Sequence, residues 1–143
     1  MKDQPTVTVR VVHRFEASAE QVFDAWLDPA TASKFLFATG PDTMVRAEID
    51  ARPGGSFSLV DRRDGEDVEH KGEYLEIARP ERLVFDFLVP KYSNDVTRVV
   101  IGIARSGSGC ELTLDHEHLN PRFAAGAESG WTAILNGLES VLG

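Results

Sequence analysis

The alternation of apolar and polar residues at the start of the chain predicts a half-buried β-strand over residues 6–15. A helical pattern follows, in which Ser18 suits the N-cap and Gln21 completes a capping box three residues later. Asp28 suits the N-cap of a second helix and Pro29 its first position, where the missing N–H has no cost. The opening segment therefore predicts one strand followed by two short helices.

The middle of the chain alternates between strand-like segments and turn signals. An expected loop at residues 40–42 comes first, and Asp64-Gly65 later suits a tight hairpin because both residues tolerate positive φ. No helical pattern separates the segments, so we expect an antiparallel meander and no doubly wound nucleotide-binding fold. The six predicted strands cover residues 44–50, 56–61, 68–77, 82–89, 96–105 and 110–118.

A long helix is predicted after Pro121, because apolar residues recur there at spacings of three and four. A second stripe along this helix contains small residues, namely Gly126, Gly130, Ala133 and Gly137. Each glycine inside a helix costs about 1 kcal/mol relative to alanine, so the stripe needs a compensating role. Tight packing of the helix on the sheet is the favoured explanation, and close approach to a bound molecule is the other.

These elements predict an α+β protein. A curved seven-stranded antiparallel sheet wraps around the long C-terminal helix, and the two short helices after strand one close one end. The chain has 143 residues, which suits a single domain over residues 1–143 with its own apolar core. A strongly curved sheet around one helix often leaves a space between them.

Composition and charge narrow the classes of partner. The chain has 15 basic and 23 acidic side chains and a net charge of −8, which disfavours binding to nucleic acids or membrane surfaces. Cys110 is the single cysteine, so no intrachain disulfide is expected. The sequence has no apolar run that predicts a signal peptide or a membrane-spanning helix, and we expect a cytoplasmic location.

The sequence offers little for catalysis or metal binding. His116 and His118 are predicted on one face of a strand and supply two metal ligands at most, so no metal site is expected. The carboxylates around the hairpin, which include Asp61, are expected in a solvated turn. Cys110 is expected to be unreactive, and no nucleophile elbow or phosphate-binding loop appears. We therefore predict no cofactor and no catalytic residue.

A set of mostly aromatic residues at inward-facing positions is the better candidate for a site. Such residues, with a few polar groups among them, are typical of a small-molecule pocket, although ordinary core packing is the favoured explanation for any single one of them. The predicted cavity-lining residues are Trp26, Phe35, Phe57, His70, Tyr74, Phe85, Phe87, His116, Trp131 and Leu135.

Several sequence blocks resemble a known family. They are SAEQVFDAW at residues 18–26, RPGGSF at 52–57, GEYLEI at 72–77 with PERLVF at 80–85, CELTLDH at 110–116, and Gly130-Trp131. Their order is similar to that in START-like (SRPBCC, helix-grip) domains of the family named after the activator of the heat-shock protein 90 ATPase. The blocks extend over nearly the whole chain, and they are more specific for the family than for any one activity.

The resemblance implies a cavity between the sheet and the last helix, where members of the wider superfamily bind lipids, sterols, polyketides and other apolar molecules. The function expected from it is non-catalytic binding of a small hydrophobic ligand by a monomer or homodimer. One alternative is a co-chaperone that activates heat-shock protein 90, although the eukaryotic activator resembles this chain only through its C-terminal domain. Another is a cyclase- or hydrolase-type enzyme that uses His70, Tyr74 and His116.

Overall fold

The computed structural model describes residues 5–37 and 43–142, so the loop expected at residues 40–42 lies outside the described residues. The described helices are α1 (Ala19–Leu27), α2 (Pro29–Phe35), a 3-10 turn η1 (Pro121–Phe123) and α3 (Ala124–Leu142). The described strands are β1 (Val7–Phe15), β2 (Met44–Ile49), β3 (Ser56–Arg63), β4 (Glu66–Ala78), β5 (Arg82–Phe87), β6 (Thr97–Ser106) and β7 (Gly109–Leu119).

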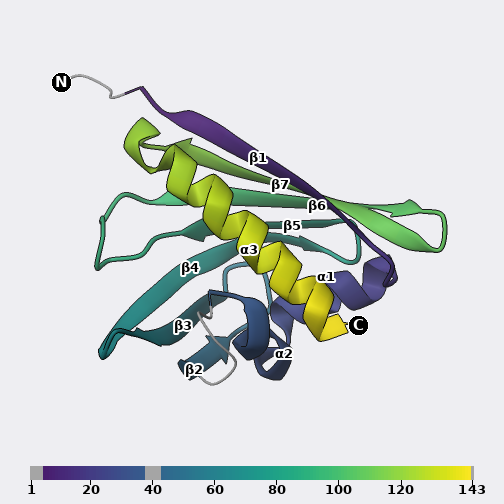
Figure 1. Cartoon of the computed structure of the whole chain (residues 1–143), viewed down its shortest axis with the longest axis horizontal. Helices are drawn as coiled ribbons and strands as arrows, with labels where there is room; N and C mark the ends of the chain where they lie inside the picture. The colour runs from purple at the N-terminus through teal and green to yellow at the C-terminus, as the bar shows by residue number, and fades with distance from the viewer. Residues whose placement is uncertain (1–4, 38–42, 143) are drawn as a thin grey trace.

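All seven strands form one antiparallel sheet in the order β1-β7-β6-β5-β4-β3-β2 (Figure 1). The predicted meander from β2 to β7 is confirmed, and β1 joins its end by pairing with β7. The turn between β3 and β4 contains Asp64 with φ of 52° and Gly65 with φ of 81°. These are the positive values that a type I′ hairpin requires.

Both short helices begin where the sequence predicted. The Ser18 hydroxyl accepts a hydrogen bond from the backbone N–H of Gln21 at 3.1 Å, and the Gln21 side chain accepts one from the backbone N–H of Ser18 at 3.0 Å. The Asp28 carboxylate accepts from the backbone N–H of Thr31 at 3.2 Å, with Pro29 in the first position of α2. These caps fix the corner between α1 and α2.

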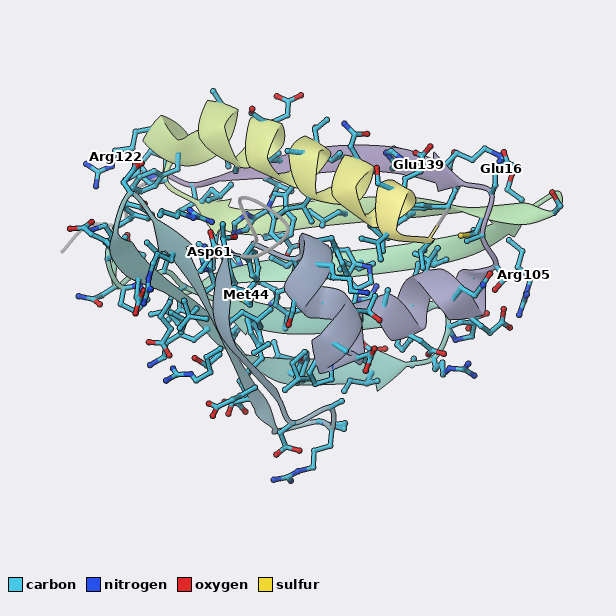
Figure 2. The ribbon with its side chains drawn as sticks, turned by 60° about the horizontal axis from the view of Figure 1, so that its bottom comes forward. Glu16, Met44, Asp61, Arg105, Arg122 and Glu139 are labelled. Atoms are coloured by element: carbon cyan, nitrogen blue, oxygen red, sulfur yellow. The ribbon has the colours of Figure 1, made fainter. Side chains whose placement is uncertain are left out.

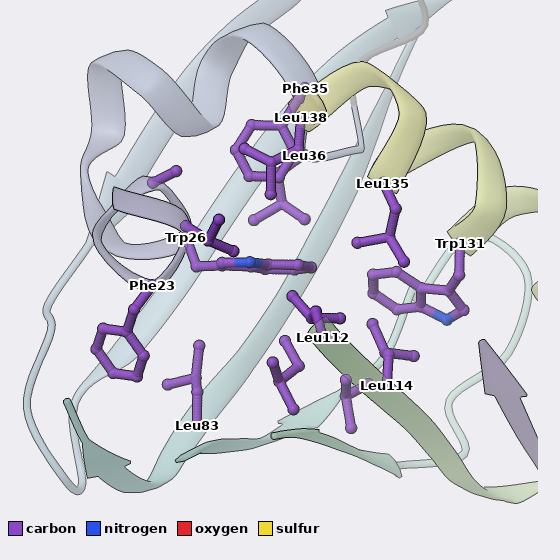
Figure 3. Close-up of a cluster of buried hydrophobic side chains, with 14 of the residues drawn as sticks. Phe23, Trp26, Phe35, Leu36, Leu83, Leu112, Leu114, Trp131, Leu135 and Leu138 are labelled. Atoms are coloured by element: carbon purple, nitrogen blue, oxygen red, sulfur yellow. The ribbon is translucent and has the colours of Figure 1, made fainter. Parts of the chain in front are cut away.

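Helix α3 runs diagonally across one face of the sheet, and α1 and α2 lie beside its C-terminal end (Figure 1). The core lies between these helices and the sheet. Figure 3 shows Trp26 of α1 extending toward Trp131 and Leu135 of α3, and the two indole centroids are 6.3 Å apart. This is the predicted α+β helix-grip arrangement.

Two strand boundaries differ from the predicted ones in ways that affect the site. Strand β3 continues to Arg63, beyond the predicted end at Asp61, because Arg63 still pairs with Glu66 across the hairpin. Strand β5 ends at Phe87 and not at residue 89, and Leu88 keeps only a bridge to Lys71. The apolar residues after Phe87 mimic a longer strand, but they line a cavity.

Candidate functional site

A cavity of about 960 Å³ lies along helix α3 and is lined by residues of this helix, of strands β3 to β7, of the segment after β5 and of the end of α2. Residues from the full length of α3 line it, from Gly126 near its start to Val141 near its end, together with Phe123 of η1. Figure 2 labels Arg122 in η1, just before this helix, and Glu139 near the C-terminal end of the helix. The volume falls in the range of roughly 300–1,000 Å³ that is typical of small-molecule sites.

Aromatic rings form one wall of the cavity. Phe37 stacks on His70, with ring centroids 4.5 Å apart, and on Phe87 at 5.0 Å. Trp131 meets Phe37 edge-on at 5.7 Å. We call these four residues the aromatic wall. All are buried, so their positions are fixed by packing before any ligand binds.

A hydrogen-bonded chain holds His116 beside this wall. The Trp131 indole N–H donates to His116 Nδ1 at 2.9 Å, and His116 Nε2 lies 2.7 Å from the Thr97 hydroxyl oxygen. The Thr97 hydroxyl also lies 3.0 Å from the carbonyl oxygen of Phe87, to which it donates. Indole is only a donor, so Nδ1 is unprotonated and Nε2–H donates to Thr97. Burial lowers the pKa of His116 to about 4, so the ring is neutral near pH 7.

An arginine stands beside the aromatic wall. Arg63 Nε donates to Asp61 Oδ2 at 2.9 Å, and Nη2 donates to the Phe37 carbonyl at 3.0 Å and to His70 Nε2 at 3.3 Å. Burial, and secondarily the charge of Arg63, lower the pKa of His70 to about 4. The expectation that Asp61 lies in a solvated turn is wrong, because this residue is fully buried. Asp61 is buried because β3 continues past it and its side chain lies on the same face of the strand as buried Phe57 and Leu59.

The small residues of α3 face the cavity. Gly126, Gly130, Ala133 and Gly137 all line it. A Cβ atom added at Gly126 or Gly130 would have no neighbour within 4 Å, whereas one at Gly137 would lie 3.6 Å from Phe35 Cβ. Tight packing on the sheet, the favoured explanation for the stripe, is therefore wrong at Gly126 and Gly130. Their missing side chains leave open space.

The structure divides the predicted cavity-lining residues into groups. Phe35, His70, Phe87, His116 and Trp131 line the large cavity. A second group surrounds a separate void of about 10 Å³, which holds one water molecule at most; its members are Trp26, Phe57, Tyr74 and Phe85. Leu135 is fully buried in the core and lines neither space.

Sequence reasoning missed three residues of the large cavity. Phe37 follows the end of α2 and lines both spaces, so its ring lies between them. Arg63 lies between the predicted strands at residues 56–61 and 68–77, and Thr97 lies within the one predicted at residues 96–105. A Thr and a His on neighbouring strands carry no distinctive spacing, and only the register of β6 against β7 brings Thr97 to His116. No sequence signal marks such a contact.

Other candidate groups do not converge on a site. His116 is buried and His118 is exposed, because a register shift in β7 and a φ of 66° at His118 turn the two rings apart. Burial raises the pKa of the Cys110 thiol, and burial together with Asp50 raises that of Tyr74. Within residues 5–37 and 43–142 no three His, Cys, Asp or Glu side chains are grouped as a metal site would require. No helix in this part of the chain is long and apolar enough to span a membrane.

A helix-grip fold with an apolar cavity under its long helix defines the class of protein, and comparison with known proteins supports this class. The sequence model of the activator of Hsp90 ATPase homolog 1-like proteins matches residues 16–143, so the chain belongs to this family. No curated protein sequence matches the chain significantly.

Solved structures share the fold across almost the whole chain. A protein from Chromobacterium violaceum is 25% identical with a TM-score of 0.81, and the match covers 94% of this chain and 96% of that one. A protein of unknown function from Staphylococcus aureus is 15% identical with a TM-score of 0.87, covering 97% and 94%. A protein from Nitrosomonas europaea is 24% identical with a TM-score of 0.80, covering 95% and 94%.

Proposed function

We propose that the chain binds a small apolar molecule in the cavity beneath α3 and that it does so without catalysis. The observation that carries this proposal is the cavity itself, about 960 Å³ in volume, which is lined by the aromatic wall and by the small residues of α3. The open space beside Gly126 and Gly130 leaves room for a flat ring system near the aromatic rings.

Affinity would come from burying the apolar surface of the ligand, at about 25 cal/mol per Å² before the costs of ordering it. Those ordering costs are low on the protein side. The aromatic wall is packed, and the Trp131 ring is fixed by its hydrogen bond to His116. The side chains of the site are therefore preorganised, and little conformational entropy is lost when a ligand binds.

The protonation states of the two cavity histidines support binding over catalysis. A general base near neutral pH needs a free nitrogen and a pKa close to the working pH. Both nitrogens of His116 already have partners, and the pKa values of His70 and His116 are lowered to about 4. Tyr74, the third residue considered for an enzyme, lines only the small void.

The test is titration with a neutral fluorescent apolar probe, N-phenyl-naphthylamine, followed by displacement with a panel of lipids and aromatic compounds. Native mass spectrometry of the same mixtures would give the stoichiometry. We expect saturable binding of one probe per chain. The variant Gly130→Leu, which places a branched side chain in the cavity, should abolish it, whereas Val12→Leu on the exposed face of β1 should not. Absence of probe binding to the unmodified chain would refute the proposal.

A second candidate function is stimulation of a heat-shock protein 90 ATPase, and the description of the matched family favours it. The measurement is the ATP turnover of purified heat-shock protein 90 with increasing amounts of this chain. A saturable rise in turnover supports the co-chaperone role, and an unchanged rate removes it. Gly130→Leu separates the two functions, because ligand binding depends on the space beside this residue, whereas stimulation that does not depend on the cavity should survive the substitution.

A further inference from the structure

Arg63 is a charged residue that contacts the aromatic wall, and one nitrogen of its guanidinium has no hydrogen-bond partner in the described part of the chain. Its Nε is bound to Asp61, and its Nη2 to the Phe37 carbonyl and to His70. The third nitrogen, Nη1, makes no hydrogen bond within residues 5–37 and 43–142. The side chain lines the cavity and is 29% exposed, although its partner Asp61 is completely buried.

The guanidinium of Arg63 is held in one orientation by the bond from Nε to Asp61 and by the two bonds from Nη2 to the Phe37 carbonyl and His70. A guanidinium is planar and rigid, so fixing Nε and Nη2 also fixes the direction of the two N–H bonds on Nη1. A ligand oxygen that accepts from Nη1 therefore finds the donor already oriented, and little side-chain entropy is lost on binding. His116 and Thr97 beside the wall are already hydrogen-bonded to each other, to Trp131 and to the Phe87 carbonyl, so they are less available to a ligand.

The charge balance around Arg63 distinguishes between possible acceptors. Arg63 and Asp61 form a neutral pair, and His70 is uncharged near pH 7. A ligand carboxylate bound at Nη1 would add a negative charge close to buried Asp61, which is costly. Lys34 and Arg122 also line the cavity, but neither belongs to the aromatic wall. A carbonyl oxygen needs only the N–H donors. A ligand cation would be repelled by Arg63.

We infer that Arg63 is the polar anchor of the cavity, and that its Nη1 group selects apolar ligands that carry an uncharged oxygen acceptor of the carbonyl type. This inference rests on the proposed function, since it concerns the orientation of a ligand in the same cavity. It excludes pure hydrocarbons and carboxylates as the preferred class.

The first experiment compares three compounds that share one rigid ring system in the unmodified chain: fluorene, fluorenone and fluorenecarboxylate. Each displaces N-phenyl-naphthylamine, so their dissociation constants are measured in one assay. A hydrogen bond to a charged donor is worth enough to make fluorenone bind about tenfold or more tightly than fluorene. Fluorenecarboxylate should bind more weakly than fluorenone. Equal affinities for fluorene and fluorenone, or tightest binding of the carboxylate, would overturn the inference.

The second experiment removes the anchor. Arg63→Gln, combined with Asp61→Asn so that no buried charge is left unpaired, should lower the affinity for fluorenone to that for fluorene and leave fluorene binding unchanged. Arg122→Gln is the matched control, because this arginine also lines the cavity but stacks on Phe123 at its rim. Retained preference for fluorenone in the double variant would refute the role of Arg63. If that variant does not fold, the comparison in the unmodified chain still decides the matter.

Failure of the proposed function has a different signature. If neither the probe nor any of the three compounds binds, the cavity is not a ligand site at all. If all bind with one affinity, the cavity binds apolar molecules and Arg63 does not select among them.

Discussion

The open space beside Gly130 leads to a prediction with an unusual sign: adding a side chain there should stabilise the protein. Gly130 lies in the middle of α3, and a Cβ atom at this position meets nothing within 4 Å. Alanine in a helix interior is more favourable than glycine by about 1 kcal/mol, because glycine loses more backbone entropy on folding. No steric cost offsets this gain in Gly130→Ala.

The expected change is large enough to measure. The entropy of unfolding of a chain of 143 residues is about 0.3 kcal/mol per kelvin, so 1 kcal/mol corresponds to a rise in Tm of roughly 3 °C. Thermal and urea unfolding followed by circular dichroism give both values. The larger variant Gly130→Leu should keep most of the gain, since leucine is also a good helix former, and should lose probe binding.

Gly72→Ala is the matched control. Gly72 lies in β4, and a Cβ atom there would come within 1.7 Å of the carbonyl oxygen of Asp86 on the neighbouring strand β5. The same substitution should therefore destabilise the protein strongly at this position. A loss of stability in Gly130→Ala would refute the argument, because it would mean that α3 packs closely against another part of the chain there.

Three further predictions concern the histidines and a helix cap. Between pH 6.5 and 4.5 the free energy of unfolding should fall by about 2 kcal/mol for each of His70 and His116, because their pKa values are about 4 in the folded chain and 6.5 in the unfolded one. Urea unfolding across this pH range tests the prediction, and a free energy that does not change with pH contradicts it. Trp131→Phe should cost about 1–3 kcal/mol and raise the pKa of His116, measured by NMR titration, because Nδ1 loses its donor. Asp28→Ala should cost about 1 kcal/mol in thermal unfolding, as the cap of α2 is lost, and an unchanged Tm would rule out this role.

The direction of the pH effect follows from which state binds protons. As the pH falls below 6.5, the unfolded chain protonates its histidines while the buried rings of His70 and His116 remain neutral. Stability is therefore complete above pH 6.5 and is lost toward pH 4. The carboxylates with lowered pKa, such as Asp24 and Asp115, contribute in the same direction only below their ordinary value of 3.8. The upper part of the range thus isolates the histidines.

The local elements could be predicted because their signals are local. The capping box at Ser18 and the Asp28-Pro29 corner each lie within four residues, and the Asp64-Gly65 hairpin requires only positive φ at two neighbouring positions. The alternation of apolar and polar residues predicts the strands, and apolar residues at spacings of three and four predict α3. Each of these patterns arises from interactions along the chain, so the sequence carries them directly.

The division between cavity and core could not be predicted in the same way. Phe57 and Phe87 are both aromatic, buried and on inward-facing strand positions, yet only Phe87 lines the large cavity. What separates them is Phe37, whose ring lies between the two spaces after the chain leaves α2 with a φ of 62°. A left-handed backbone at a phenylalanine has no sequence signature.

The cavity and the glycine stripe explain each other. If α3 served only to cover the sheet, alanine at Gly130 would make the protein more stable, and the described contacts give no packing reason for glycine there. The stability lost by having glycine is explained if a ligand needs the space that the missing side chain leaves, since natural proteins sacrifice stability at functional sites. The aromatic wall is buried and packed, so removing its side chains to widen the cavity would cost far more. Small residues on the cavity-lining face of α3 are the cheaper way to make room, and filling this space should therefore raise stability while it lowers binding.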